Sequence, residues 1–230
     1  GSTTIKTMKT AWAPTSGVLG SQFIVSLSVA MKSDIYVRNT GSNVDIYTMN
    51  SSEKSKYYWI CKRQSDHTYI FKSAYDGKVL DVQGAGTTSG TNVFTSASNG
   101  GGNQRWYICR MCYKGDYEVY RLIPKGNNSN EVHMSLDIAN AKTDKGTNIQ
   151  VVDRNLTDAQ KFKLNYYSGT EITSLKISNG NQTLAKGNSK NLSIAFTPSN
   201  TPCNSVIWKS NNKNVVDIDE NTGKITAKSI

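Results

Sequence analysis

Three near-copies of one tetrapeptide constrain the fold of this chain more than any other feature. They read Gly-Ser-Asn-Val at 41–44, Gly-Thr-Asn-Val at 90–93 and Gly-Thr-Asn-Ile at 146–149. Similar segments that recur at this distance indicate one supersecondary unit used three times. The sequence therefore predicts an internally repeated architecture.

Two further motifs keep fixed distances from the tetrapeptide in the second and third copies. Asp81 and Asp137, each within Leu-Asp-Val or Leu-Asp-Ile, stand eleven residues before its asparagine. Gln104 and Gln160 stand twelve residues after that asparagine. Chance rarely aligns three motifs at two fixed offsets, so we interpret each copy as the same supersecondary unit.

An aromatic residue closes each copy: Trp59, Trp106 and Phe162. Helical periodicity is hard to find. Short alternating strands lie between turn formers instead, which is typical of an all-β barrel or sandwich. The threefold repeat favours a closed barrel of about twelve strands. In such a barrel we expect the three aromatic rings to share one core layer.

The pattern changes near residue 167, where the repeat ends. Residues 168–171 are predicted to form a linker, and residues 172–230 contain a second set of strand-like segments. These segments lie at 172–177, 191–198, 206–210, 215–218 and 222–227. They predict a separate β-sandwich after the barrel.

The repeated part resembles the ricin-B-type (R-type) lectin β-trefoil. The resemblance rests on the motifs Leu-Asp-Val, Gly-Thr-Asn-Val and Gln-x-Trp. This resemblance covers 18–167, after an N-terminal tag and lead-in at 1–17. Residues 172–230 resemble a bacterial group 2 immunoglobulin-like domain. This resemblance rests on Phe-Thr-Pro-Ser, Ile-Trp-Lys-Ser and Thr-Gly-Lys-Ile-Thr-Ala. That family normally continues with one or two more strands, so the resemblance implies an incomplete sandwich.

In the lectin family each repeat can carry a shallow sugar pocket. An aspartate accepts hydrogen bonds from sugar hydroxyls, and an aromatic ring stacks on the apolar face of the sugar. The second repeat keeps Asp81, Asn103 and Gln104. Its stacking position is Ser96, and Phe94 is the substitute two residues earlier. This repeat alone keeps all three polar positions.

The third repeat keeps Asp137, Gln150 and Gln160, but has Val152 at the stacking position and Ala159 in place of the asparagine. In both repeats an alternative is open. Each aspartate can instead tie down its own loop, and each glutamine amide can pin a turn.

The first repeat has the aromatic residue, Tyr47. An ungapped alignment places Lys32 where the aspartate belongs, and Tyr57 replaces the glutamine. No repeat is complete, so the resemblance implies weak single sites, on the order of millimolar.

The formal charge of +10 has two interpretations. One is ordinary solvated lysines, since no basic block is present. The other is attraction to an acidic polymer. Cys61, Cys109, Cys112 and Cys203 lack the four-ligand spacing of a zinc site. We expect them to be free structural thiols, with a local Cys109–Cys112 bridge as the alternative.

No catalytic or metal-binding set is recognisable, and no cofactor is expected. His67 is interpreted as a turn residue, and His133 belongs to no metal or nucleophile motif. The leading hypothesis is a noncatalytic carbohydrate-binding module of a secreted or cell-surface bacterial protein, as a segment of a larger secreted enzyme or surface protein. Its expected partner is a polysaccharide or cell-surface glycan. We expect no nucleic acid partner and no membrane insertion, and a monomer.

Two rival functions remain open from the sequence. The first is a structural or adhesion module whose trefoil has lost its sugar sites, which the missing stacking residues favour. The second is a trefoil inhibitor of another protein, for which no feature argues specifically. Retained aspartates and glutamines favour the lectin hypothesis over both.

Overall fold

The computed structural model describes residues 19–114, 117–126, 133–167, 174–197, 199, 206, 208–219 and 222–228, with side chains between 112 and 117 outside this description. The predicted lead-in at 1–17 and linker at 168–171 lie outside these residues. The chain forms two compact units, which divide between Tyr167 and Ser168.

The first unit is a β-trefoil with twelve strands in one sheet system. The strands of this unit are β1 (Gln22–Val29), β2 (Lys32–Asn39), β3 (Val44–Thr48), β4 (Tyr58–Arg63), β5 (Tyr69–Ser73), β6 (Val79–Val82), β7 (Thr91–Ser96), β8 (Trp106–Lys114), β9 (Tyr117–Pro124), β10 (Met134–Ile138), β11 (Thr147–Asp153) and β12 (Phe162–Tyr166). Six of them close a barrel through the antiparallel pairs β1–β4, β4–β5, β5–β8, β8–β9, β9–β12 and β12–β1.

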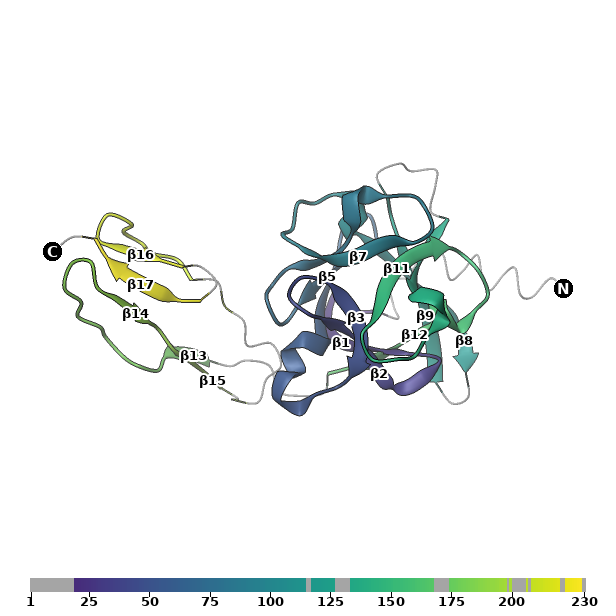
Figure 1. The fold of residues 1–230 in the computed structure, drawn as a ribbon, viewed down its shortest axis with the longest axis horizontal. Helices are drawn as coiled ribbons and strands as arrows, with labels where there is room; N and C mark the ends of the chain where they lie inside the picture. Colours follow the sequence, from purple (N-terminus) through teal and green to yellow (C-terminus); the bar gives the residue numbers. More distant parts are fainter. Residues whose placement is uncertain are drawn as a thin grey trace. The chain divides into compact units, whose positions relative to one another are not determined.

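Three hairpins, β2–β3, β6–β7 and β10–β11, complete the trefoil. Their second strands meet, because β11 pairs with both β3 and β7 (Figure 1). Short 3₁₀ helices connect the strands: η1 (Ser51–Tyr57), η2 (Gln83–Ala85), η3 (Gly102–Gln104), η4 (Ala139–Ala141) and η5 (Asp158–Gln160). The predicted pseudo-threefold barrel is confirmed.

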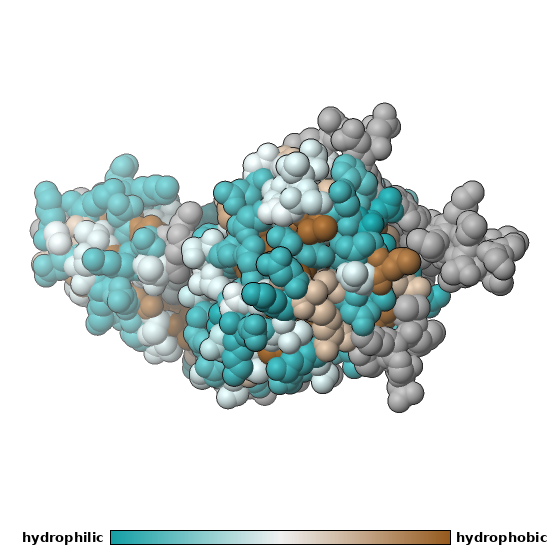
Figure 2. All heavy atoms as spheres, turned by 45° about the vertical axis from the view of Figure 1, so that its right-hand side comes forward, coloured by the Kyte–Doolittle hydropathy of each residue, from teal (hydrophilic) through white to brown (hydrophobic). Residues whose placement is uncertain are grey.

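The predicted aromatic core layer is also present. Trp59, Trp106 and Phe162 have no exposed surface and belong to one hydrophobic cluster. Trp106 Nε1 donates a hydrogen bond to the carbonyl of Leu80, 3.1 Å away. Burying side chains of this size supplies much of the hydrophobic stabilisation of a barrel. On the face shown in Figure 2, the barrel surface is mostly hydrophilic, with small separate hydrophobic patches.

The tetrapeptide repeated at 41–44, 90–93 and 146–149 has a structural explanation. Its first residue has a positive φ in all three copies, +98° at Gly41, +94° at Gly90 and +86° at Gly146, which favours glycine. Its asparagines, Asn43, Asn92 and Asn148, form a closed ring. In that ring each Nδ2 donates to the next Oδ1 at 2.8, 3.1 and 3.0 Å. The repeated motif therefore turns each hairpin and joins the three hairpins.

The second unit contains a two-stranded and a three-stranded sheet. The strands are β13 (Ser174–Ile177), β14 (Ser189–Asn191), β15 (Ile194–Thr197), β16 (Val216–Ile218) and β17 (Lys224–Ala227). Pairing runs β13–β15 and β14–β17–β16. Among its described residues only Gly223, Ile225 and Ala227 are buried.

One predicted strand of this unit is wrong. Of residues 206–210, the described ones do not form a strand. Trp208 instead packs over the turn before β17, where a Cβ added to Gly223 would lie 2.6 Å from the indole. Gly223 also has a φ of +70°, so both space and backbone conformation require glycine.

Cys61 and Cys109 are buried free thiols, as predicted for those two positions. Cys61 shares the core with Trp59, two residues earlier on β4. Burial raises the pKa of the Cys109 thiol to about 11, so it is unreactive at neutral pH. The Cys112 side chain and Cys203 lie outside the described residues. His67 lies in a turn, where its N–H donates to Gln64 O, as predicted.

Candidate functional site

In the second repeat the three predicted polar residues come together around one carboxylate. Asp81, at 4% exposure on β6, accepts hydrogen bonds from Asn103 Nδ2 at 2.6 Å and Gln104 Nε2 at 2.8 Å. The Ser96 hydroxyl also donates to it. Phe94 is half-buried and lies directly opposite Asp81 in the β6–β7 register, so both side chains are on one face.

The third repeat forms a similar but looser net. Asp137, at 5% exposure on β10, accepts from Gln150 Nε2 and Gln160 Nε2, both at 3.2 Å. Burial raises the pKa of Asp137, while the two amide hydrogen bonds act in the opposite direction. The carboxylate is therefore surrounded by neutral donors.

The glutamine of each closing motif also pins its own loop. Gln104 Nε2 donates to Ala97 O at 3.0 Å, and Gln104 Oε1 accepts from the Asn99 N–H at 2.8 Å. Gln160 makes the equivalent bonds to Asp153 O and the Asn155 N–H, both at 3.0 Å. Both side chains have no exposed surface. This is the loop-pinning alternative that the sequence left open.

The first repeat performs the same pinning with a different residue. The Tyr57 hydroxyl donates to Thr48 O at 2.8 Å. Thr48 precedes the turn at the same place as Ala97 and Asp153 in the other repeats, four residues after the end of the tetrapeptide. The Tyr57 side chain is fully buried, so it replaces the glutamine as a structural residue.

Sequence reasoning missed a further threefold set. Asn50, Asn99 and Asn155 each accept, through Oδ1, the backbone N–H two residues on, at 3.0, 2.7 and 2.9 Å. Such turns favour asparagine. The signal was present, because each of these residues stands seven positions after the asparagine of its tetrapeptide. They fix the loops that lead into the closing motifs.

The ungapped placement of Lys32 in the first repeat is wrong. Lys32 lies at the start of β2, opposite Val29, and the residue at the aspartate position is Arg38. Arg38 pairs in register with Asp45, as Asp137 pairs with Gln150. The cause is a shorter turn, since Arg38 precedes Asn43 by five residues rather than eleven.

Arg38 changes the chemistry of this repeat. Its Nε and Nη2 donate to the Asp45 carboxylate at 2.8 and 2.5 Å, and its guanidinium lies 3.9 Å from the centroid of the Tyr47 ring. A cation therefore already covers the aromatic ring that would stack on a sugar. The first repeat lacks an available carboxylate and an open ring face.

Within the described ranges, no group of three or more histidine, cysteine, aspartate or glutamate side chains is arranged to hold a metal ion. Likewise, no helix in that part of the chain has the length and apolar character needed to cross a membrane.

Two families match the chain, one after the other. Residues 54–152 match the family described as ricin-type beta-trefoil lectin domain-like, and residues 171–230 match the bacterial Ig-like domain (group 2). No curated protein matches the sequence.

Solved structures match the barrel. A designed threefold-symmetric protein, ThreeFoil, is 25% identical with a TM-score of 0.53. The match covers 62% of this chain and 97% of the ThreeFoil chain. A ricin B-like lectin from Macrolepiota procera, solved with lactose, is 16% identical with a TM-score of 0.53, covering 64% and 97%.

An exo-β-1,3-galactanase from Clostridium thermocellum is 19% identical with a TM-score of 0.52. The match covers 63% of this chain and 30% of the galactanase chain. The latter two likenesses establish the fold alone. The chain is therefore all-β with a β-trefoil as its first unit, and it matches the ricin-type beta-trefoil lectin-like family and the bacterial group 2 Ig-like family in that order.

Proposed function

We propose that the trefoil is a noncatalytic carbohydrate-binding module of a secreted or cell-surface bacterial protein, with a polysaccharide or cell-surface glycan as its partner. The observation that carries this proposal is the second-repeat net. One carboxylate, two side-chain amides and a half-buried aromatic ring converge there on one hairpin. A pyranose offers the complementary surfaces, a rim of hydroxyls and an apolar face.

The net favours hydroxyl-rich ligands for a physical reason. Asp81 is held in place by donors from Asn103, Gln104 and Ser96, so its orientation is set before any ligand arrives. A preorganised acceptor loses little conformational entropy on binding. Asn103 is half-buried and is suited to exchange its hydrogen bond for one to a sugar hydroxyl.

The rival function is a structural or adhesion module without sugar sites. Loop pinning favours it, because Gln104 and Gln160 are fully buried and occupied by their own loops. The Arg38–Asp45 pair in the first repeat favours it too. In either case the same bonds stabilise the fold, so only a binding experiment separates the two functions.

The direct test is titration of soluble and insoluble polysaccharides, followed by NMR of the backbone amides. We expect weak saturable binding, on the order of millimolar, with shifts centred on residues 81–104. Asn103→Ala should weaken it, because it removes one donor without touching the core. Tyr47→Ala in the first repeat is the matched control and should leave binding unchanged. Absence of binding to every glycan at millimolar concentration would favour the structural module.

A gain of function sharpens this test. Val152 occupies the stacking position of the third repeat, is half-buried and lies opposite Ser135. Val152→Tyr should add a stacking surface worth about 0.5–1.5 kcal/mol, which is roughly a twofold to tenfold gain in affinity. Val215→Tyr, at an exposed position of the second unit, controls for nonspecific adhesion of a new tyrosine. Equal gains in both variants would contradict a sugar pocket beside Asp137.

A further inference from the structure

A buried positive charge on β9 is not explained by the sugar nets. Arg121 is only 4% exposed. Its Nη2 donates to Asn155 O, while its Nε is buried without a hydrogen-bond partner. Burial lowers the pKa of this guanidinium, and the nearby Arg154 lowers it further. Buried charges are normally paired, because removing them from water is costly.

The acidic groups nearest in sequence to its loop are engaged elsewhere. Asp153 lies 3.4 Å from His133 Nε2, and Asp158 accepts from Lys161 Nζ at 2.9 Å. Within the part of the chain that the structure describes, no carboxylate forms an ion pair with Arg121. Its register partner on β8 is Cys109, whose raised pKa keeps it a neutral thiol. The buried Nε–H of Arg121 is therefore a donor that no protein acceptor in the described ranges uses.

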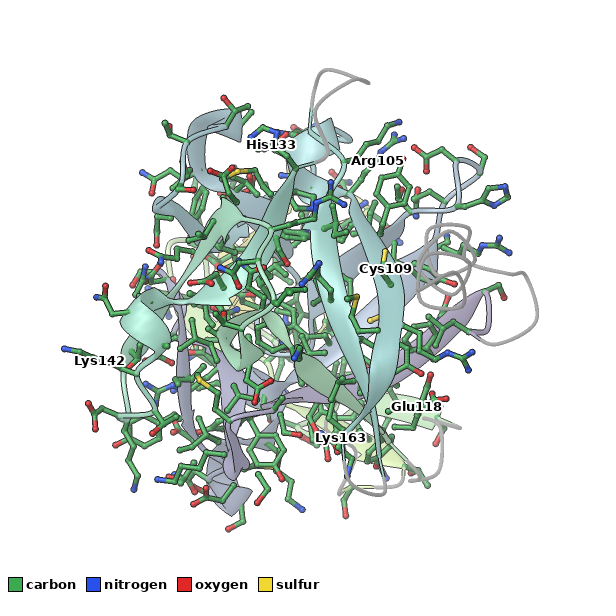
Figure 3. The ribbon with its side chains drawn as sticks, turned by 90° about the vertical axis from the view of Figure 1, so that its right-hand side faces the viewer. Arg105, Cys109, Glu118, His133, Lys142 and Lys163 are labelled. Atoms are coloured by element: carbon green, nitrogen blue, oxygen red, sulfur yellow. The ribbon has the colours of Figure 1, made fainter. Side chains whose placement is uncertain are left out.

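Arg121 is hydrogen-bonded to the loop of the third repeat at Asn155. Figure 3 shows Cys109, its register partner, midway along the β8–β9 ribbon between His133 at one end and Glu118 at the other. From Arg121 a chain of hydrogen bonds leads through Asn155 to Gln160 and then to Asp137. The Arg121 guanidinium is therefore linked to the net of the third repeat through Asn155 and Gln160.

The rim of this loop also differs from its counterparts. Arg154 is exposed, and Leu156 is 80% exposed. At the equivalent positions the second repeat has Ser98 and Gly100, and the first has Met49 and Ser51. A second cation and an apolar side chain thus border the loop in the third repeat alone.

We propose that Arg121 and Arg154 form an oxyanion subsite beside the hydrogen-bond net of Asp137 in the third repeat, for the carboxylate or sulfate of an acidic polysaccharide. Guanidinium groups match the planar and tetrahedral oxygens of such anions. Leu156 supplies an apolar surface next to the charge. The sugar part of this inference rests on the proposed function. The net charge of +10 also favours an acidic partner.

The first experiment uses sodium sulfate as the probe, at constant ionic strength against sodium chloride. NMR follows the Nε–H signal of Arg121 and the backbone amide of Asn155. We expect saturable shifts with sulfate beyond those with chloride, weakened at least about tenfold in Arg154→Gln and largely recovered in Arg154→Lys. Arg110→Gln is the matched control. That arginine is exposed on β8 and paired with Glu118, so its loss should not change the titration.

A second arm compares polygalacturonate with its methyl ester, and dextran sulfate with dextran, to separate a carboxylate source from a sulfate source. In each pair we expect the charged polymer to bind more tightly, and Arg154→Gln to remove that difference. Neutral polysaccharide binding without any sulfate response would overturn the subsite and leave the proposed function standing. A sulfate response without binding of any polysaccharide would support the subsite and contradict the proposed function. An equal loss in Arg110→Gln would also overturn it.

Discussion

The first repeat and the two that follow share one scaffold but differ at the rim. All three contribute an asparagine to the axial ring, a fully buried aromatic residue to the core and an asparagine that fixes the loop. At the rim, the first repeat has the Arg38–Asp45 ion pair, whereas Asp81 and Asp137 are held by amides. Positions that join the repeats therefore keep their residue type, while the charged positions of the three hairpins vary.

This contrast also shows that one structural task accepts different chemistry. Tyr57 reaches the Thr48 carbonyl with its hydroxyl, and Gln104 reaches the Ala97 carbonyl with its amide. The glutamine accepts a backbone N–H in addition, which a phenol at this position does not replicate in the first repeat. The retention of glutamine in two repeats thus reflects loop geometry as well as any ligand.

The largest expected effect tests the shared core. Trp106→Ala should lower the free energy of unfolding by about 3–5 kcal/mol, because it empties a fully buried site. Phe162→Ala should fall in the same range if the repeats contribute equally. Urea denaturation measures both, with Tyr75→Ala, 41% exposed, as the control. A cost near zero for either ring would mean that the core is not shared.

The next largest effect compares the two ways of fixing a loop, by the amide of Gln104 and by the hydroxyl of Tyr57. Gln104→Ala leaves the Asn99 N–H and the Ala97 carbonyl without their partner, so we expect a loss of about 2–3 kcal/mol. Tyr57→Phe removes one hydrogen bond and keeps the buried ring, so we expect about 1 kcal/mol. Gln160→Ala replicates the first variant in the third repeat. If Tyr57→Phe costs as much as Gln104→Ala, the two residues do not differ in their roles.

The sequence predicted the barrel because its signal is spacing, and spacing is fixed where repeats pack on one another. It misplaced Lys32 because the turn from Thr40 to Asn43 is tight, with Thr40 N bonded to Asn43 O at 2.9 Å. The other two hairpins carry a 3₁₀ helix there, η2 or η4. Linear spacing does not reveal where six residues have been lost within a hairpin.

The site was harder to predict than the fold. Asp81, Gln104 and Gln160 were identified by position, but their hydrogen-bond partners depend on how a loop folds back. The sequence does not distinguish a glutamine whose amide bonds to its own loop from one whose amide faces a ligand. The unpaired Arg121 had no local signal, because its burial follows from the pairing of β8 with β9 and from the loop at Asn155.

The smallest effect concerns pH and contrasts a charge-paired carboxylate with one held by amides. Partial burial by itself raises the pKa of Asp66, but hydrogen bonds from Lys125, Thr68 and Arg105 outweigh it and hold that pKa well below the usual range. Burial instead raises the pKa of Asp137. The unfolded value for both is about 3.9. The stabilising contribution of Asp66 is therefore present above about pH 4 and is lost as the pH falls below it.

Asp137 should show the opposite slope. Its folded state holds the proton more tightly than the unfolded state, so its contribution to stability decreases as the pH rises from about 4 through its folded pKa. We expect each effect to be below about 1 kcal/mol, since Asp66 is partly exposed and the amides offset the burial of Asp137. Unfolding free energies of wild type, Asp66→Asn and Asp137→Asn between about pH 2 and 7 measure both slopes. The Asp66→Asn difference from wild type should shrink on acidification, and the Asp137→Asn difference should change in the opposite direction. Parallel pH profiles for the two variants would contradict the distinction between ion-paired and amide-held carboxylates.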